Sequence, residues 1–365
     1  MKVLLISPAS SIHTIRWANS LTTEVDEIAL ASMHEPLEEL NKNVRLFKLK
    51  HKAPFGYFTN RKALKKIIEQ FKPDIINTHY LSGYGTLSGL SVNKHNTPYL
   101  LSMWGSDIFD FPEKSLFHKM LIEWVAKKST RLASTSNAMK LEFIKKYPSI
   151  RIPIDITPFG VNTKLFSPKM NNRRKSNTTF EIGIAKVLEK KYGIKYLIEA
   201  FKLLQKEKQF SNSRLHIIGS GRKELELKKI SEKNENIIFY GRINNSELPQ
   251  HINKWHVSVI PSILDSESFG VSAVEVSSCG IPVIVSNVGG LPEVVKNNES
   301  GIVVRKENAR EIYEKLKVLF LNEDLRIQMG KKGREHVLQN YDWDKNVKTM
   351  LEVYNKTISD FNSMT

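Results

Sequence analysis

One stretch decides the fold of this chain: Pro261-Ser262-Ile263-Leu264-Asp265-Ser266-Glu267-Ser268-Phe269-Gly270-Val271-Ser272-Ala273-Val274-Glu275. The short apolar run 257–260 comes before it, and Pro261 stops that run as the end of a buried parallel strand would. A helical pattern begins at Val271, after a mostly polar loop. A loop that enters a helix presents backbone N–H groups and the positive end of the helix dipole. The stretch therefore predicts a binding site for an anion such as a diphosphate.

Two carboxylates flank this turn, Glu267 in the loop and Glu275 in the predicted helix. A carboxylate does not suit a phosphate, but it can accept two hydroxyl hydrogen bonds from a vicinal diol. A sugar–diphosphate–ribose ligand needs this alternation of hydroxyl acceptors around an anion site. The residues thus favour a nucleotide-diphosphate-sugar as a ligand.

The composition sets broad limits on the class of protein. The chain has 365 residues, enough for two domains, and 41% of them are hydrophobic. It starts with an apolar strand pattern rather than a signal peptide, has no apolar run long enough to span a membrane, and contains one cysteine. We therefore predict a cytoplasmic protein without disulfides.

The net charge of +17 favours contact with polyanions, namely nucleic acid, an anionic lipid surface or diphosphate substrates. A general bias of the composition toward lysine explains part of this excess. No nucleic-acid-binding module is recognisable in the sequence, so nucleic acid is not predicted as a partner.

Strand and helix patterns alternate along both halves of the chain, which predicts two parallel, doubly wound sheets. The loops after the carboxyl ends of the strands form the expected ligand side of each sheet. The predicted strands lie at 3–7, 28–31, 44–47, 75–78, 99–102, 131–134 and 154–157, and then at 180–184, 214–218, 236–240, 257–260, 282–285 and 301–304.

Four motifs in this order resemble the donor-binding signature of the family 4 retaining glycosyltransferases, also called glycosyl transferases group 1. They are Glu267-Ser268-Phe269-Gly270, Glu275, Cys279-Gly280-Ile281-Pro282-Val283 and Gly289-Gly290-Leu291-Pro292-Glu293. The resemblance implies the GT-B fold, in which two Rossmann-like domains face a central cleft. We place the acceptor-side domain at 1–165, a linker at 166–178, the donor-binding domain at 179–341, and at 342–365 a terminal helix that crosses back to the first domain.

The resemblance also implies a reaction. The enzyme would move a sugar, with retention of configuration, from a nucleotide-diphosphate donor to a lipid-linked or envelope-polysaccharide acceptor, without a metal ion or other cofactor. No covalent nucleophile is evident, so we expect front-face attack through an oxocarbenium-like state. Three alternatives stay open: a GT-B nucleotide-sugar epimerase, a GT-B phosphorylase with a lysine-bound cofactor, and a non-catalytic glycosyltransferase-like partner subunit.

Five residues match positions that are central to this reaction. Lys186, in place of the family's arginine, and Lys191 would hold the leaving diphosphate. Glu267 would orient the sugar hydroxyls, Glu275 would hold the ribose, and Asp107 would accept a hydrogen bond from the attacking hydroxyl. The other donor-binding positions implied by the resemblance are Phe269, Gly270, Val271, Gly241, Arg242 and Gly160.

The acceptor side is expected at the strand ends of the first domain. The loop after the first strand lacks the family's glycines, so His13 and Arg16 would supply side-chain contacts, or else form an ordinary surface turn. His79 ends a predicted strand near the cleft. Trp104 stands where the family often has histidine, and it could stack on a sugar face.

Two further segments have alternative interpretations. Asp342-Trp343-Asp344 matches the metal-binding D-x-D motif of another glycosyltransferase fold, but its place before a helix favours a helix cap. Residues 109–128 combine aromatic side chains with lysines, which suits either peripheral contact with the anionic inner face of the plasma membrane or a buried helix under the cleft.

Overall fold

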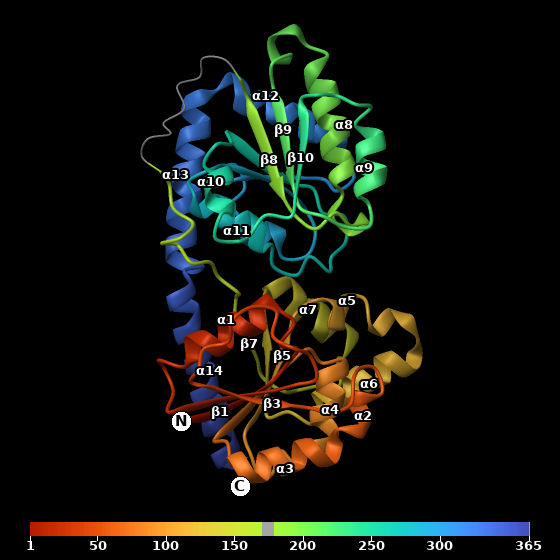
Figure 1. Ribbon diagram of the computed structural model, residues 1–365, viewed down its shortest axis with the longest axis vertical. Coiled ribbons are helices and arrows are strands. Elements are labelled where there is room, and N and C mark those ends of the chain that lie inside the picture. Colours follow the sequence, from red (N-terminus) through yellow and green to blue (C-terminus); the bar gives the residue numbers. More distant parts are fainter. Residues whose placement is uncertain (170–178, 365) are drawn as a thin grey trace. The chain divides into compact units, whose positions relative to one another are not determined.

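The computed structural model describes residues 1–169 and 179–364, and these divide into two compact units. Unit 1 comprises Met1–Pro158 and Lys345–Thr365, and unit 2 comprises Phe159–Asp344. Each unit is built on a parallel sheet with helices on both faces (Figure 1), so the predicted α/β, doubly wound architecture is confirmed.

Unit 1 has a seven-stranded sheet in the order β3-β2-β1-β4-β5-β6-β7. The order reverses direction between β1 and β4, and ligands of such sheets bind at this switch point, beyond the carboxyl ends of the strands. The strands are β1 (Lys2–Ile6), β2 (Glu27–Ser32), β3 (Val44–Lys48), β4 (Ile75–His79), β5 (Tyr99–Met103), β6 (Arg131–Ser134) and β7 (Ile154–Ile156).

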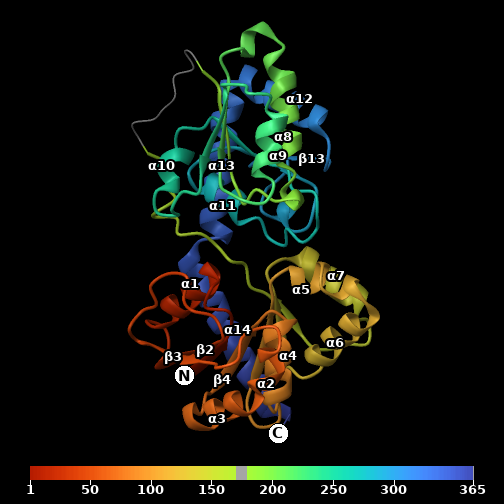
Figure 2. The same cartoon turned by 45° about the vertical axis from the view of Figure 1, so that its right-hand side comes forward.

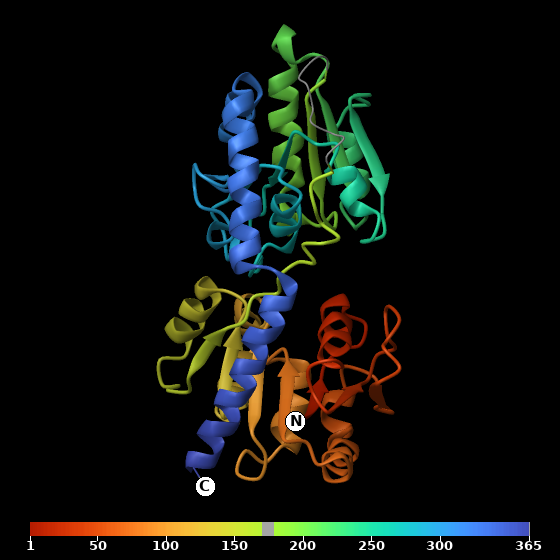
Figure 3. The ribbon, with the colours of Figure 1, turned by 90° about the vertical axis from the view of Figure 1, so that its left-hand side faces the viewer.

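Helices cover both faces of this sheet because successive side chains of a strand point to opposite faces. Ile76 of β4 belongs to a core with residues of α3 and α4, whereas Asn77 meets Tyr354 of α14 on the other face. Figure 3 shows α14 lying across the strands, and Figure 2 shows α5, α6 and α7 beside one another. The helices are α1 (Ile12–Leu21), α2 (Gly56–Thr59), α3 (Arg61–Phe71), α4 (Gly83–Ser91), α5 (Ser106–Phe109), α6 (Leu116–Ala126), α7 (Asn137–Lys146) and α14 (Trp343–Met364).

Unit 2 repeats this plan with a six-stranded sheet in the order β10-β9-β8-β11-β12-β13, whose switch point lies between β8 and β11. The α8, α9 and α12 helices pack on one face, and α11 and α13 pack together on the other. The strands are β8 (Glu181–Ala185), β9 (Arg214–Ile218), β10 (Ile237–Gly241), β11 (Val257–Ile260), β12 (Val283–Ser286) and β13 (Ile302–Val304). The helices are α8 (Ile194–Gln205), α9 (Glu224–Ile230), α10 (Leu248–Ile252), α11 (Val271–Ser278), α12 (Ala309–Leu321) and α13 (Glu323–Asn340).

The boundaries of the units differ in part from those expected from the sequence. Unit 1 ends at Pro158 rather than at 165, because the next residues pack within unit 2. Val161 pairs with Asp342, and the Ser278 hydroxyl donates a hydrogen bond to the Phe166 carbonyl oxygen at 2.6 Å. Most of the expected linker, residues 170–178, lies outside the described residues.

Residues from Lys345 onward return to unit 1 through α14. Polar contacts with β4 and β6 help to fasten this helix. Arg131 of β6 donates to Asp360 at 2.5 Å, and the Tyr354 hydroxyl donates to Asn77 at 3.1 Å.

Candidate active site

An ion pair marks the switch point of unit 2. Lys186 directly follows β8, and its Nζ lies 2.9 Å from a carboxylate oxygen of Glu267 in the loop after β11. Both side chains are about nine-tenths buried. Two further hydroxyls touch the pair: Ser272 lies 3.4 Å from Lys186 Nζ, and Ser262 donates to the Glu267 carboxylate at 3.3 Å. The residues predicted to bind diphosphate and sugar are therefore in direct contact.

The loop that carries Glu267 depends on two glycines after β12. Gly289 has φ +50, and a β-carbon there would overlap the carbonyl oxygen of Glu267. A β-carbon on Gly290 would overlap the carbonyl oxygen of Ser268, and the Gly290 N–H donates to the Glu267 carbonyl oxygen at 3.0 Å. Only glycine allows this approach, so the Gly289-Gly290 motif serves to position Glu267.

Lys191, the second predicted diphosphate ligand, contacts the same aromatic ring as Lys186. Lys186 Nζ lies 4.6 Å and Lys191 Nζ 4.8 Å from the centre of the Tyr192 ring. The segment is held beside the Glu267 loop because Ile263 N–H donates to the Lys191 carbonyl oxygen at 2.8 Å. Sequence reasoning missed Tyr192, although an aromatic residue next to the lysines was the available signal.

Helix α11 begins at the predicted anion site. Gly270, with φ +96, precedes it, and Val271 is its first residue. Glu275 lies on the next turn, is 6% exposed, and accepts a hydrogen bond from Asn245 Nδ2 at 3.2 Å. The sequence did not indicate Asn245, because no motif surrounds it.

Phe269, predicted as a donor-binding residue, has its side chain enclosed within unit 2. Its ring is 3% exposed and packs edge-on against Phe159 at 6.1 Å and Tyr341 at 5.4 Å between ring centres. The enclosed ring packs inside unit 2 and supports the loop. Only the backbone of Phe269 is therefore left to contact a ligand.

The remaining predicted donor residues of unit 2 lie at other loops. Gly241 ends β10 with φ +70, and the space where its β-carbon would lie is open. Its carbonyl oxygen accepts the Gly219 N–H at 2.7 Å, which joins the ends of β9 and β10, and Arg242 beside it is exposed. Gly160, with φ +70, lies in the segment that pairs with the start of α14. Of these predicted residues, Gly241 and Arg242, at the end of β10, lie at the carboxyl edge of the unit 2 sheet.

His79, predicted from the sequence as an acceptor-side residue, lies buried inside unit 1. It is 1% exposed; its Nδ1 lies 2.9 Å from the Ser7 hydroxyl and its Nε2 3.0 Å from Asn77 Oδ1. An amide oxygen only accepts, so Nε2 carries the proton and Nδ1 accepts from Ser7. The Ser7 oxygen in turn lies 2.7 Å from the Thr14 hydroxyl. Burial, aided by the nearby charge of His13, lowers the pKa of His79 to about 3.

Asp107, predicted to accept a hydrogen bond from the attacking hydroxyl, is enclosed by backbone donors. It is 0% exposed, and its carboxylate accepts the backbone N–H groups of Leu81, Trp104 and Gly105 at 2.9, 3.2 and 2.8 Å. Burial raises the pKa of Asp107, against the opposing effect of these donors. The carboxylate therefore clamps the loops after β4 and β5 together.

Trp104 faces protein side chains rather than an open surface. It is 8% exposed, with ring centres 4.3 Å from His79, 5.1 Å from Tyr80 and 6.0 Å from His13. Burial raises the pKa of Tyr80 to about 12, so this hydroxyl stays protonated at neutral pH. His13 and Arg16 are half-buried on α1. The structure thus brings His13, His79 and Trp104 together as a packed cluster.

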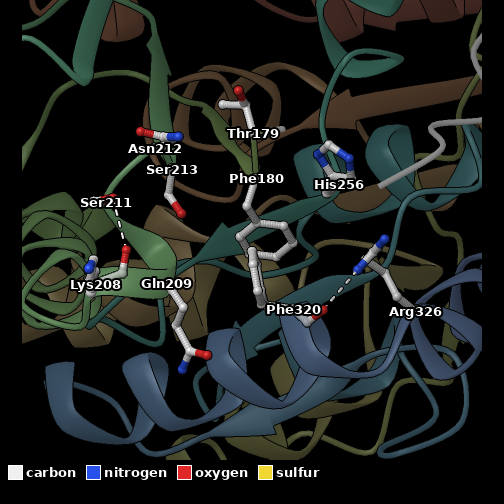
Figure 4. A pocket seen from close by; sticks show the side chains of 10 residues that line it. All are labelled: Thr179, Phe180, Lys208, Gln209, Ser211, Asn212, Ser213, His256, Phe320 and Arg326. Atoms are coloured by element: carbon white, nitrogen blue, oxygen red, sulfur yellow. Dashed lines mark hydrogen bonds between the residues drawn. The ribbon is translucent and has the colours of Figure 1, made fainter. Parts of the chain in front are cut away.

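A hollow of unit 2 lies at the opposite edge of its sheet. It has a volume of about 230 Å³ and is lined by residues at the starts of β8, β9 and β11, such as Phe180, Ser213 and His256 (Figure 4). Since Lys186 and Glu267 follow the carboxyl ends of β8 and β11, this hollow is not part of the candidate site.

The two aspartates of the D-x-D motif make protein contacts. Thr163 donates to Asp342 at 2.5 Å, and Lys164 lies 3.4 Å from Asp344. Within residues 1–169 and 179–364, no three histidine, cysteine or acidic side chains are grouped as metal ligands. The same residues contain no helix that is long and apolar enough to cross a membrane.

Comparisons with known proteins agree on one family. The glycosyl transferases group 1 model matches residues 167–336, and the glycosyl transferase 4-like model matches 2–136. An uncharacterised glycosyltransferase of Methanocaldococcus jannaschii is 28% identical over 319 residues, which is 86% of this chain and 85% of that protein.

Solved structures share the fold. Sucrose-phosphate synthase from Thermosynechococcus elongatus superposes with a TM-score of 0.82 at 19% identity, covering 98% of this chain and 99% of that one. Anabaena HepE in complex with UDP-glucose superposes with a TM-score of 0.79 at 17% identity, covering 98% and 100%. The two matched domains, the order of the motifs and the GT-B fold together establish that this chain belongs to the group 1 glycosyltransferases and is a glycosyltransferase enzyme.

Proposed function

We propose that this enzyme transfers a sugar from a nucleotide-diphosphate donor with retention of configuration and without a metal ion. The observation that carries the proposal is the Lys186–Glu267 pair at the switch point of unit 2, with the start of α11 four residues from Glu267 in the sequence. A cation and helix N–H groups suit a diphosphate, and a carboxylate suits sugar hydroxyls. The UDP-glucose complex of HepE, which has the same fold, supports a donor of this kind.

In this proposal each residue has a separate task. Lys186 and Lys191 offset the charge that develops on the leaving diphosphate, where preorganised cations act most strongly. When the donor binds, Glu267 exchanges its ion pair with Lys186 for hydrogen bonds from the sugar hydroxyls. Glu275 accepts hydrogen bonds from the ribose hydroxyls. Asp107 is enclosed by backbone donors, so we assign it no contact with the attacking hydroxyl. The acceptor hydroxyl then attacks the anomeric carbon from the face that the diphosphate leaves: the bond from this carbon to the diphosphate oxygen breaks, the bond to the acceptor oxygen forms, and the hydroxyl proton passes to the departing diphosphate.

A donor screen with product detection tests this function. The purified chain is incubated with UDP-, GDP- and ADP-sugars and saccharide or lipid-linked acceptors, with and without EDTA. We expect acceptor-dependent release of the nucleotide diphosphate that is unchanged by EDTA, and NMR should show the donor's anomeric configuration in the product. Conversion of the donor without any acceptor would favour the epimerase, and loss of turnover on chelation would contradict the metal-free reaction.

For the acceptor, we propose a lipid-linked or envelope saccharide at an anionic membrane surface, with the enzyme peripheral on the cytoplasmic side. Helix α6 carries the supporting observation. Ile122, Val125 and Ala126 face the core of unit 1. On the opposite face Leu116, Phe117 and Met120 are 73%, 67% and 59% exposed, with Trp124 one turn further on. The helix is therefore half-buried, and its outer face is apolar.

The charges around this face favour an anionic bilayer over a second copy of the chain. Lys114 lies 5.5 Å from the Phe111 ring and Lys128 5.5 Å from the Trp124 ring, and Lys119 is exposed without an ion pair among the described residues. Two such faces in a dimer would bring like charges together, whereas each lysine near an anionic leaflet contributes about 1 kcal/mol. Aromatic and leucine side chains beside lysines suit insertion at the level of the headgroups.

Vesicle co-sedimentation tests this surface. We expect binding to vesicles with phosphatidylglycerol, weaker binding as salt rises, and little binding to phosphatidylcholine alone. Replacing Leu116, Phe117 and Met120 together by serine should abolish binding, while Leu321→Ser, at an exposed leucine of unit 2, should not. Equal, negligible binding to both vesicle types at low salt would contradict the proposal, and salt-independent self-association would point to a dimer face.

A further inference from the structure

We infer that Tyr192 is a positioning residue, whose ring holds the ammonium groups of Lys186 and Lys191 for one leaving diphosphate. This inference rests on the proposed function and assigns a task to a residue outside the motifs. The ring centre lies 4.6 Å from Lys186 Nζ and 4.8 Å from Lys191 Nζ. Both distances are within the range in which a cation is attracted to an aromatic face.

The position of Tyr192 in the chain makes it a fixed support. It ends the short 3-10 helix Lys190–Tyr192, and Gly193, with φ +60, follows as the residue before α8. A β-carbon on Gly193 would overlap the Pro261 carbonyl oxygen, so this turn is pressed against the start of the Glu267 loop. The ring itself packs against the core of unit 2.

The ring also has a task that the neighbouring polar groups cannot perform. Lys186 is held by Glu267 at 2.9 Å and by Ser272 at 3.4 Å. When sugar hydroxyls bind to Glu267, the ion pair between Glu267 and Lys186 is lost. The Lys186 side chain would then become more mobile in the step in which its ammonium group must contact the diphosphate. The ring contact uses no hydrogen-bonding group, so it can persist while the N–H groups of Lys186 turn to the phosphate oxygens. Tyr192 thus keeps both cations in place during the exchange.

Calorimetry with UDP, GDP and ADP tests this, and the diphosphate that binds the wild-type chain serves as the probe. Tyr192→Leu, which keeps an apolar contact with the core, should weaken binding of that diphosphate by about 2- to 30-fold, the range of one or two cation–π contacts. Tyr192→Phe, which keeps the ring and removes the hydroxyl, should stay within about twofold of wild type. In the sugar-transfer assay the leucine variant should lower kcat more than it raises KM.

A double-mutant cycle separates positioning from a general structural role. In a chain that already carries Lys186→Ala and Lys191→Ala, Tyr192→Leu should cause no further loss of diphosphate affinity. An equal loss in both backgrounds, or a loss in Tyr192→Phe as large as in Tyr192→Leu, would overturn the inference. If the lysine variants lose affinity and Tyr192→Leu does not, only the role of Tyr192 fails. If the lysine variants bind normally, or no diphosphate binds, the proposed function itself fails.

Discussion

The Tyr354 hydroxyl donates a hydrogen bond to Asn77 Oδ1 at 3.1 Å, although 277 residues separate them in the sequence. Tyr354 belongs to the terminal helix α14, and Asn77 lies inside the sheet of unit 1 on β4. Both side chains are buried. The same Asn77 oxygen accepts from His79 Nε2, so one amide joins the terminal helix to the histidine at the switch point of unit 1.

Removal of this hydrogen bond should destabilise unit 1. Tyr354→Phe keeps the ring and leaves Asn77 Oδ1 with its remaining partner, so we expect a loss of about 1 kcal/mol. Denaturant unfolding measures the change in the free energy of unfolding, provided that its slope against denaturant concentration is the same in both proteins. Tyr196→Phe is the matched control, since its hydroxyl meets Glu307 at the surface, and it should change stability by less than about 0.5 kcal/mol. Equal effects of the two variants would contradict the anchoring role of Tyr354.

His79 should make unit 1 sensitive to acid above the range in which carboxylates titrate. Its pKa is lowered to about 3 in the folded protein, whereas an unfolded histidine has a pKa near 6.5. Below pH 6.5 the unfolded chain therefore binds the extra proton, and stability falls as the pH drops from 6.5 toward 3. Between pH 7 and pH 5 this group alone should cost about 2 kcal/mol.

Native-state hydrogen exchange of the β4 amides at pH 7 and pH 5, corrected for intrinsic rates, measures that loss. His79→Gln lowers stability at both pH values, but the difference between the two should shrink by about 2 kcal/mol relative to wild type. The other histidines are unchanged in this comparison. An identical pH dependence in both proteins would show that the pKa of His79 is not lowered in the folded protein, and would contradict the prediction.

The two carboxylates of unit 2 should affect different steps. Glu267→Ala should lower turnover by about 100-fold or more with little change in nucleotide affinity, because this carboxylate is assigned to the sugar. Glu275→Ala should mainly weaken nucleotide binding, because it is assigned to the ribose. Calorimetry and steady-state kinetics on both variants decide the matter, and the reverse pattern would exchange the two roles.

Loss of either lysine should raise the barrier for departure of the diphosphate. We expect Lys186→Ala and Lys191→Ala each to lose about 1.5–4 kcal/mol of transition-state stabilisation, measured as kcat/KM. Lys190→Ala is the control, since this exposed neighbour makes no ion pair among the described residues. A decrease for Lys190→Ala as large as for the other two would show that only the overall charge of the segment matters.

Two glycines allow a test of how the Glu267 loop is held. Gly289→Ala would put a β-carbon into the carbonyl oxygen of Glu267, whereas Gly280→Ala would make only an ordinary contact with Pro168. Both residues have positive φ, +50 and +73, so both variants incur the strain of that backbone, about 1 kcal/mol. Only Gly289→Ala should also lower sugar-transfer activity, which kinetics on the two folded variants will show. Equal activity of the two variants would mean that the loop adapts.

The sequence determined the fold and the order of the motifs. Short apolar runs at the spacing of strands, separated by helical patterns, are local features, and they require parallel sheets whichever side chains meet later. The Glu267–Gly270 loop and Gly289-Gly290 were recognisable because their chemistry is contained in a few consecutive residues. For residues 109–128 the sequence supported two alternatives, and α6 is buried on one face and exposed on the other.

Only the tertiary structure decided which polar residues can meet a ligand. His79 ends β4 and Asp107 lies on α5 shortly after β5, on the side of the sheet where ligands bind. Yet His79 is enclosed by Ser7, 72 residues away, and Asp107 by the Leu81 N–H, 26 residues away. The contact between Lys186 and Glu267, across 81 residues, likewise exists because β8 and β11 are neighbours at the point where the strand order reverses. The burial of a side chain and its hydrogen-bond partners depend on residues that are distant in the sequence and that the sheet brings together. No local sequence pattern therefore predicts them.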